Sequence, residues 1–119
     1  MTDAHKAAER PEDITRLIVE YVNAGDAEGA AGLYASDAVM AFPPGEVTEG
    51  RDAIRAVYER IIEQGVRFQP ESPLTTLRLG DVARTATAAG DEAGARAQVA
   101  QRQPDGSWLR ILDRPDFRG

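Results

Sequence analysis

The chain has 119 residues and no cysteine, so its length is typical of one domain and disulfide or thiol chemistry is excluded. Lysine and arginine number 14 against 20 aspartates and glutamates, and the net charge of −6 disfavours binding to nucleic-acid phosphates. No apolar run approaches the roughly 20 residues that span a membrane, and the polar N-terminus has no signal-peptide core. We therefore expect a cytoplasmic protein without a nucleic-acid or membrane partner.

The N-terminal quarter of the sequence predicts two helices. Residues 1–10 are polar and are expected to form a flexible arm before one domain over 11–119. An apolar stripe at helical spacing then predicts a first helix, which ends near Gly25. The stripe consists of Ile14, Leu17, Ile18, Tyr21 and Val22. Asp26 can cap a second, short helix that is expected to run to about Tyr34.

The next segment reads as a short strand, a break and a third helix. Residues 39–42 predict a strand, which must stop at Pro43-Pro44 because proline has no N–H to donate. The third helix is expected from about residue 50 to Gly65. Its stripe consists of Ile54, Val57, Tyr58, Ile61 and Ile62.

Beyond Gly65 the apolar period changes from helical to strand-like. Strands are expected near 66–70, 73–79, 81–89, 94–103 and 107–114. The stretch QPDGS at 103–107 predicts a tight hairpin turn, and AGDEAG at 89–94 a looser one. Helices followed by a run of strands indicate an α+β fold, in which the helices cover one face of a curved antiparallel sheet and leave a pocket between.

Three stretches resemble one known superfamily. They are GDAEGAAGLYASDAVMAFPPGEVTEGRDAIRAVYER at 25–60, GDVARTATA at 80–88 and RQPDGSWLRILDRP at 102–115. Together they resemble the nuclear-transport-factor-2-like (NTF2-like) superfamily, and within it the SnoaL-like and DUF4440-type proteins related in fold to ketosteroid isomerase. The resemblance implies an NTF2-like cone, with three N-terminal helices packed on a curved antiparallel sheet. It also implies a conical pocket for a small hydrophobic molecule and a homodimer formed through the outer sheet face.

The resemblance does not extend to ketosteroid isomerase chemistry. The positions that match its general base, its oxyanion-donating tyrosine and its second donor are Phe42, Ile18 and Gln98 here. Phenylalanine cannot accept a proton and isoleucine cannot donate a hydrogen bond, so this reaction is excluded. Two supporting tyrosines of that enzyme are matched by Tyr34 and Tyr58.

Asp113 is the candidate general base. Strand alternation places Leu109, Ile111 and Asp113 on one face, and a carboxylate at the end of an apolar face suits proton abstraction. Tyr34 and Tyr58 are the candidate donors. Alternatively, Asp113 pairs with a nearby arginine or caps the chain reversal at Pro115. The residues expected to line the pocket are Ile18, Met40, Phe42, Gln98 and Ile111.

The pairing of the last two strands stays open at this point. Counting back from the hairpin turn places Asp113 with Ala97 and Val99, whereas the family match places Gln98 on the pocket side. A slip of one residue reverses the two faces of a strand. The same uncertainty decides whether an arginine faces the pocket. The candidates are Arg84, Arg96 and Arg102.

No phosphate-binding loop, nucleophile elbow or metal-spaced His/Cys cluster occurs, so no cofactor or metal is expected. Three functions remain open. The first is a cofactor-free acid–base enzyme of isomerase, cyclase or hydrolase type, and the second is a non-catalytic ligand-binding module. The third is a dimeric assembly domain that uses its outer sheet face.

Overall fold

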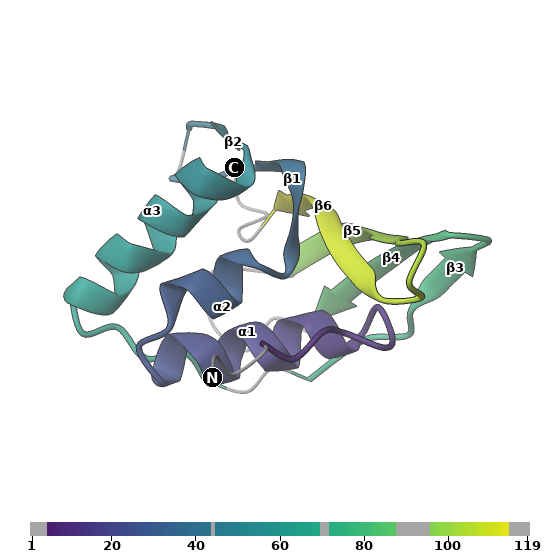
Figure 1. The fold of residues 1–119 in the computed structure, drawn as a ribbon, viewed down its shortest axis with the longest axis horizontal. Coiled ribbons are helices and arrows are strands. Elements are labelled where there is room, and N and C mark those ends of the chain that lie inside the picture. The colour runs from purple at the N-terminus through teal and green to yellow at the C-terminus, as the bar shows by residue number, and fades with distance from the viewer. Residues whose placement is uncertain (1–4, 44, 70–71, 88–95, 115–119) are drawn as a thin grey trace.

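The computed structural model describes residues 5–43, 45–69, 72–87 and 96–114 of the chain, and it has the predicted α+β architecture (Figure 1). The helices are α1 (Asp13–Asn23), α2 (Ala27–Ala31) and α3 (Arg51–Glu63). The strands are β1 (Tyr34–Met40), β2 (Thr48–Glu49), β3 (Leu77–Leu79), β4 (Val82–Thr87), β5 (Arg96–Arg102) and β6 (Trp108–Arg114).

The six strands form one sheet in the order β2-β1-β6-β5-β4-β3. All neighbouring pairs are antiparallel except β1 and β6, which run parallel. The predicted antiparallel sheet is therefore confirmed for every described pair except this one. A parallel pair needs a long crossover, and here α3 and four strands separate β1 from β6 in the sequence.

The helices cover the inner face of this sheet. Tyr34 and Arg110 are paired across β1 and β6, so their side chains share a face. On that face Tyr58 of α3 lies against Tyr34, and Thr15 of α1 accepts a hydrogen bond from Arg110. The core between helices and sheet is built from their apolar stripes, with Ile14, Ile54 and Trp108 almost fully buried.

The local signals for helix ends are confirmed. The Asp26 carboxylate accepts a hydrogen bond of 2.8 Å from the backbone N–H of Gly29 and caps α2. Gly25 and Gly65, which follow α1 and α3, have φ angles of 77° and 75°. Such angles favour glycine because it has no Cβ.

Several predicted boundaries are wrong. The strand expected at 39–42 is the end of the longer β1, which stops at Met40, and the strand expected at 73–79 is formed only over Leu77–Leu79. The second helix stops at Ala31, and Tyr34 already begins β1, where it pairs with β6. The expected strand at 66–70 is not formed over the described residues 66–69. Instead, the Asn23 side chain holds the backbone of Phe68, donating to its carbonyl at 2.9 Å and accepting from its N–H at 2.8 Å.

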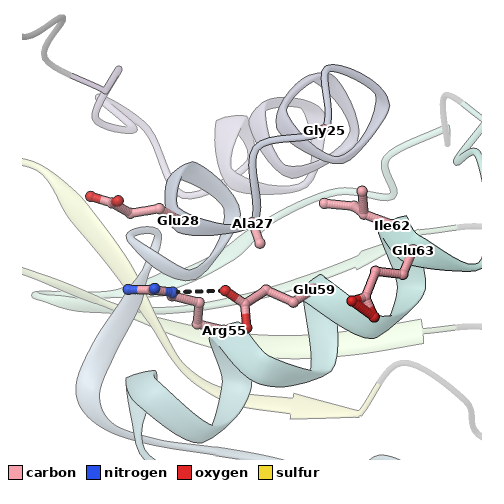
Figure 2. A pocket seen from close by; sticks show the side chains of 7 residues that line it. All are labelled: Gly25, Ala27, Glu28, Arg55, Glu59, Ile62 and Glu63. Atoms are coloured by element: carbon pink, nitrogen blue, oxygen red, sulfur yellow. Dashed lines mark hydrogen bonds and ion pairs between the residues drawn. The ribbon is translucent and has the colours of Figure 1, made fainter.

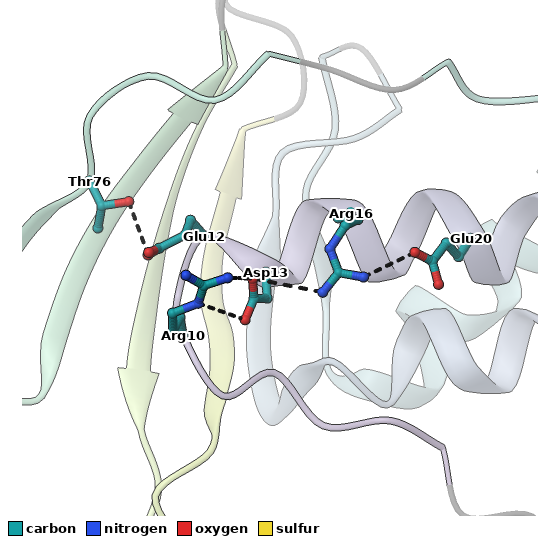
Figure 3. A network of polar contacts seen from close by, with 6 residues as sticks. All are labelled: Arg10, Glu12, Asp13, Arg16, Glu20 and Thr76. Carbon is teal, nitrogen blue, oxygen red and sulfur yellow. Dashed lines mark hydrogen bonds and ion pairs between the residues drawn. The ribbon is translucent and has the colours of Figure 1, made fainter.

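Part of the predicted N-terminal arm packs against the domain. Ala8 is fully buried and forms a bridge to Trp108, whose N–H donates to the Ala8 carbonyl at 2.9 Å. The start of α1 is held by side chains as well: Arg10 and Arg16 both contact the Asp13 carboxylate, as Figure 3 shows. The flexibility of this arm stays a prediction.

A β-bulge in β6 settles the pairing question. Near the turn, Ala100 pairs with Arg110, but the next pair is Val99 with Leu112, so Ile111 is an extra residue. Beyond the bulge Gln98 pairs with Asp113. The family match was therefore right, and the simple count from the turn was wrong by one residue. The looser hairpin predicted at 89–94 lies outside the described residues.

Within the part of the chain that the structure describes, no helix combines the length and the apolarity needed to cross a membrane.

Candidate functional site

Asp113 lies at the centre of a buried polar cluster on the inner sheet face. Only 6% of Asp113 is exposed, and its Oδ2 accepts a hydrogen bond of 2.5 Å from the Tyr34 hydroxyl. The Tyr58 hydroxyl lies 2.8 Å from that of Tyr34. The structure thus brings together Asp113, Tyr34 and Tyr58, which come from β6, β1 and α3. Their catalytic roles stay predictions.

Arg110 completes the cluster, and sequence reasoning missed it. Its Nη1 lies 3.6 Å from Asp113 Oδ2, its Nη2 donates to Thr15 at 2.8 Å, and only 4% of the residue is exposed. Burial has the largest single effect and by itself lowers the pKa of the Arg110 guanidinium. The Asp113 carboxylate and the neighbouring Tyr34 and Tyr58 together outweigh it, so the pKa is raised. The ion-pairing alternative for Asp113 is therefore what the geometry shows, with a partner that was not among the predicted arginines.

The predicted arginines lie elsewhere. Arg84 pairs with Leu77 and Val99 and is exposed on the outer sheet face. Arg102 forms an exposed ion pair with Asp81. The side chain of Arg96 is outside the described part of the structure.

Strand alternation failed to group Leu109, Ile111 and Asp113 because of the bulge. Along β6 the buried residues are Trp108, Arg110 and Asp113, whereas Leu112 is 49% exposed. Residues three apart lie on opposite faces of a regular strand. Only the extra residue Ile111 turns Arg110 and Asp113 to the same side. A bulge has no reliable signature in a single sequence, so no pattern in WLRILDRP indicated this pair.

Two buried polar atoms of the cluster lack a partner among the described residues: Asp113 Oδ1 and Arg110 Nε. A buried acceptor without a hydrogen bond costs about 1–3 kcal/mol, and more when it is charged. Such an atom in a folded protein calls for an explanation, such as a bound water or a ligand.

The residues predicted to line the pocket surround Asp113 in part. Across the sheet, Thr85, Gln98, Asp113 and Met40 form one continuous row of paired residues on the inner face. The Thr85 hydroxyl donates to Gln98 Oε1 at 3.1 Å. Ile18 and Met40 are buried, whereas Phe42 and Ile111 are partly exposed. Whether these side chains line a ligand cavity stays a prediction.

A separate hollow lies on the surface between α2 and α3 (Figure 2). It has a volume of about 530 Å³ and contains none of the predicted pocket residues. Its polar lining is mostly acidic, and its Arg55 is engaged by Glu59 at 3.3 Å. The lining residues are Gly25, Ala27, Glu28, Arg55, Glu59, Ile62 and Glu63.

Burial raises the pKa of Tyr34 well above its usual value near 10, and the negative charge of Asp113 adds to this effect. A raised pKa in the folded state contributes stability that is complete below pH 10 and is lost as pH rises toward the folded value. We predict that the unfolding free energy of the wild type falls above pH 10 more steeply than that of Tyr34→Phe. Urea unfolding from pH 8 to 11 measures this, with Tyr21→Phe as control. Equal slopes for wild type and Tyr34→Phe would contradict the assignment.

No group of three or more His, Cys, Asp or Glu side chains among the described residues is arranged to hold a metal ion.

Comparison with known proteins connects this geometry to a family. The model of the SnoaL-like domain matches residues 14–118. No curated protein matches the chain.

Solved structures share the fold at low identity. A protein from Thiobacillus denitrificans described as a calcium/calmodulin-dependent protein kinase type II association domain superposes with a TM-score of 0.73, at 19% identity over 92% of this chain and 98% of its own. A protein of unknown function from Mycobacterium tuberculosis gives 0.68, at 25% identity over 87% and 70%. A ketosteroid isomerase-like protein from Erwinia carotovora atroseptica gives 0.66, at 21% identity over 87% and 89%.

Proposed function

Because the chain belongs to the SnoaL-like domain family, within the NTF2-like superfamily, we propose that it binds a small, largely apolar organic molecule at the buried face of Asp113. The observation that carries this proposal is Asp113 Oδ1, a buried carboxylate oxygen without a partner among the described residues. Met40 and Gln98, which pair with Asp113 across the sheet, supply one apolar and one polar neighbour. Buried polar groups in a mostly apolar interior are typical of small-molecule sites.

A fragment screen tests the proposal. Neutral fluorinated aromatic fragments are added to the ¹⁵N-labelled protein, and binding is located from backbone amide shifts. We expect the shifts to centre on Met40, Phe42 and Gln98. Shifts confined to Gly25, Ala27 and Glu59 would instead place the ligand in the surface hollow between α2 and α3, and they would overturn the proposal. An absence of binding across the screen would also overturn it.

The second candidate function is a cofactor-free acid–base enzyme, with Asp113 as the base. The same Oδ1 favours it, because this oxygen retains lone pairs that can take a proton. A general base can be detected without knowing the natural substrate. It should catalyse the exchange of the hydrogens beside the carbonyl of a bound ketone with deuterium from D₂O. Because a ketone has no donor for Oδ1, 4-fluoroacetophenone is supplied in large excess. We expect exchange with the wild type and none with Asp113→Asn if the protein is an enzyme. Binding without exchange favours the binding module.

Ketosteroid isomerase chemistry is not proposed. Ile18, at the position of the tyrosine donor, is 4% exposed in the α1 stripe, and Phe42 occupies the position of the base. Neither side chain has a polar atom.

We further propose a homodimer through the outer face of the sheet. Leu79 is 86% exposed and pairs with Val82, while Leu77 and Leu112 lie one row further on the same face. Exposed apolar side chains gathered on one face indicate an interaction surface. An assembly domain would use this same outer face to bind its partner. The cytoplasmic location stays a prediction.

The dimer gives a prediction of its own. Leu79→Arg combined with Leu112→Arg should convert a dimer to a monomer in sedimentation velocity, because it places charges in the apolar surface. Val47→Arg is the matched control, since Val47 is 61% exposed but precedes β2, away from that face. A wild type that sediments as a monomer at high concentration would contradict the dimer.

A further inference from the structure

We infer that the ligand of this site is a neutral molecule that presents a hydroxyl or N–H group to Asp113, and that carbonyl compounds and carboxylates are disfavoured. This inference rests on the proposed binding function and adds the chemical class of the ligand. It follows from asking which hydroxyl and guanidinium hydrogens of the cluster already donate to another atom of the protein.

Neither tyrosine hydroxyl has its hydrogen available for a ligand. The Tyr34 hydroxyl donates to Asp113 Oδ2 at 2.5 Å. A hydroxyl carries one hydrogen, so in the 2.8 Å contact between the two tyrosines Tyr58 must be the donor and Tyr34 the acceptor. The direction of donation is therefore fixed from Tyr58 to Tyr34 to Asp113. The predicted role of these tyrosines as donors to a substrate conflicts with this order.

The Nε–H of Arg110, which has no partner among the described residues, is directed away from Asp113. The guanidinium of Arg110 is a planar fork. Its Nη1 faces Asp113, whereas Nη2, which lies on the same edge as the Nε–H, donates to Thr15 of α1. The Nε–H therefore points along the edge that faces α1. On the Asp113 side, the unpartnered atom is the acceptor Oδ1.

Charge excludes an anionic ligand at this position. Arg110 and Asp113 form a buried pair with no net charge, and Arg110 already faces Oδ2. A carboxylate beside Oδ1 would place two negative charges together in a poorly solvated interior, which is strongly unfavourable. A neutral O–H or N–H group satisfies Oδ1 and leaves the charge balance unchanged.

Four matched probes test this inference by ¹⁹F NMR with the wild-type protein. They are 4-fluorophenol, 4-fluorotoluene, 4-fluoroacetophenone and 4-fluorobenzoate. The phenol and the toluene have nearly the same shape, so they differ chiefly in the hydrogen-bond donor. We expect the phenol to bind at least about tenfold more tightly than the toluene, since a hydrogen bond to a charged acceptor is among the stronger ones. The benzoate should not compete with it.

Asp113→Asn should reverse the preference. The amide oxygen would keep the Tyr34 and Arg110 contacts, and the amide NH₂ would then face the ligand as a donor. We expect 4-fluoroacetophenone to gain and 4-fluorophenol to lose affinity by about tenfold each.

The outcomes separate the two proposals. If phenol and toluene bind the wild type equally at the Asp113 site, Oδ1 holds only a bound water and the inference is overturned, while the binding function stands. If none of the four probes binds at that site, the proposed function itself fails. Because the wild-type series needs no substitution, the inference stays testable even if Asp113→Asn does not fold.

Discussion

Replacing Arg110 by methionine is expected to lower the free energy of unfolding by about 3–5 kcal/mol. The methionine fills much of the same volume, but Asp113 would remain buried without its counter-charge, and the Thr15 hydroxyl would lose its donor. The cost comes from the charge left behind more than from the attraction removed. Urea unfolding monitored by circular dichroism measures the change.

A double-mutant cycle separates these two contributions. Asp113→Leu alone should also be strongly destabilising, because it leaves Arg110 buried and unpaired. The combined variant should lose much less than the sum of the two single losses, since neither charge remains. Arg55→Met is the matched control: its ion pair with Glu59 is half-exposed, and we expect a change within about 0.5 kcal/mol. A loss below 1 kcal/mol for Arg110→Met would show that the pair is hydrated and that the site is open to water.

The fold was predictable to the extent that local patterns determine it. The stripes of α1 and α3 and the capping residues Asp26, Gly25 and Gly65 act through contacts within a few residues, so the sequence alone reveals them. The QPDGS turn belongs to the same class: the Gln103 N–H donates to the Ser107 carbonyl, and Gly106 has a φ of 89°.

The errors concern features that depend on distant contacts. Tyr34 was assigned to the end of a helix, but pairing of β1 with the remote β6 draws it into the sheet. The segment 66–69 has a strand-like composition, yet its backbone is engaged by the Asn23 side chain. Tertiary contacts override local propensity in both cases.

The candidate site was predictable in its members but not in its electrostatics. Asp113, Tyr34 and Tyr58 were selected one by one, and the structure joins them by hydrogen bonds. Arg110 was missed because it lies three positions before Asp113, a spacing that places the two side chains on opposite faces unless a bulge intervenes. Missing Arg110 changes the role expected of Asp113. An isolated carboxylate suggests a base, whereas a carboxylate paired with an arginine suggests a fixed hydrogen-bond acceptor.

Replacing Trp108 by alanine should be as damaging as the loss of Arg110, at about 3–5 kcal/mol of unfolding free energy. Trp108 is 2% exposed and starts β6, where its backbone N–H holds Ala8 of the N-terminal arm. Arg78 and Arg102 lie over its ring, with guanidinium carbons 5.0 and 6.0 Å from the centroid. Alanine would leave a cavity beneath the arm and remove both cation–π contacts.

Trp108→Phe should lose distinctly less than Trp108→Ala, because a phenyl ring fills much of the space and still faces the two arginines. The chain has one tryptophan, so the unfolding of both substituted variants is followed by circular dichroism.

Fluorescence is used for chains that keep Trp108. Deleting residues 2–9 should shift the Trp108 emission to longer wavelength than in the wild type, because the deletion uncovers the indole. An unshifted emission together with a small loss for Trp108→Ala would show that the arm does not cover this ring in solution, and that β6 begins as a solvated strand rather than as part of the core.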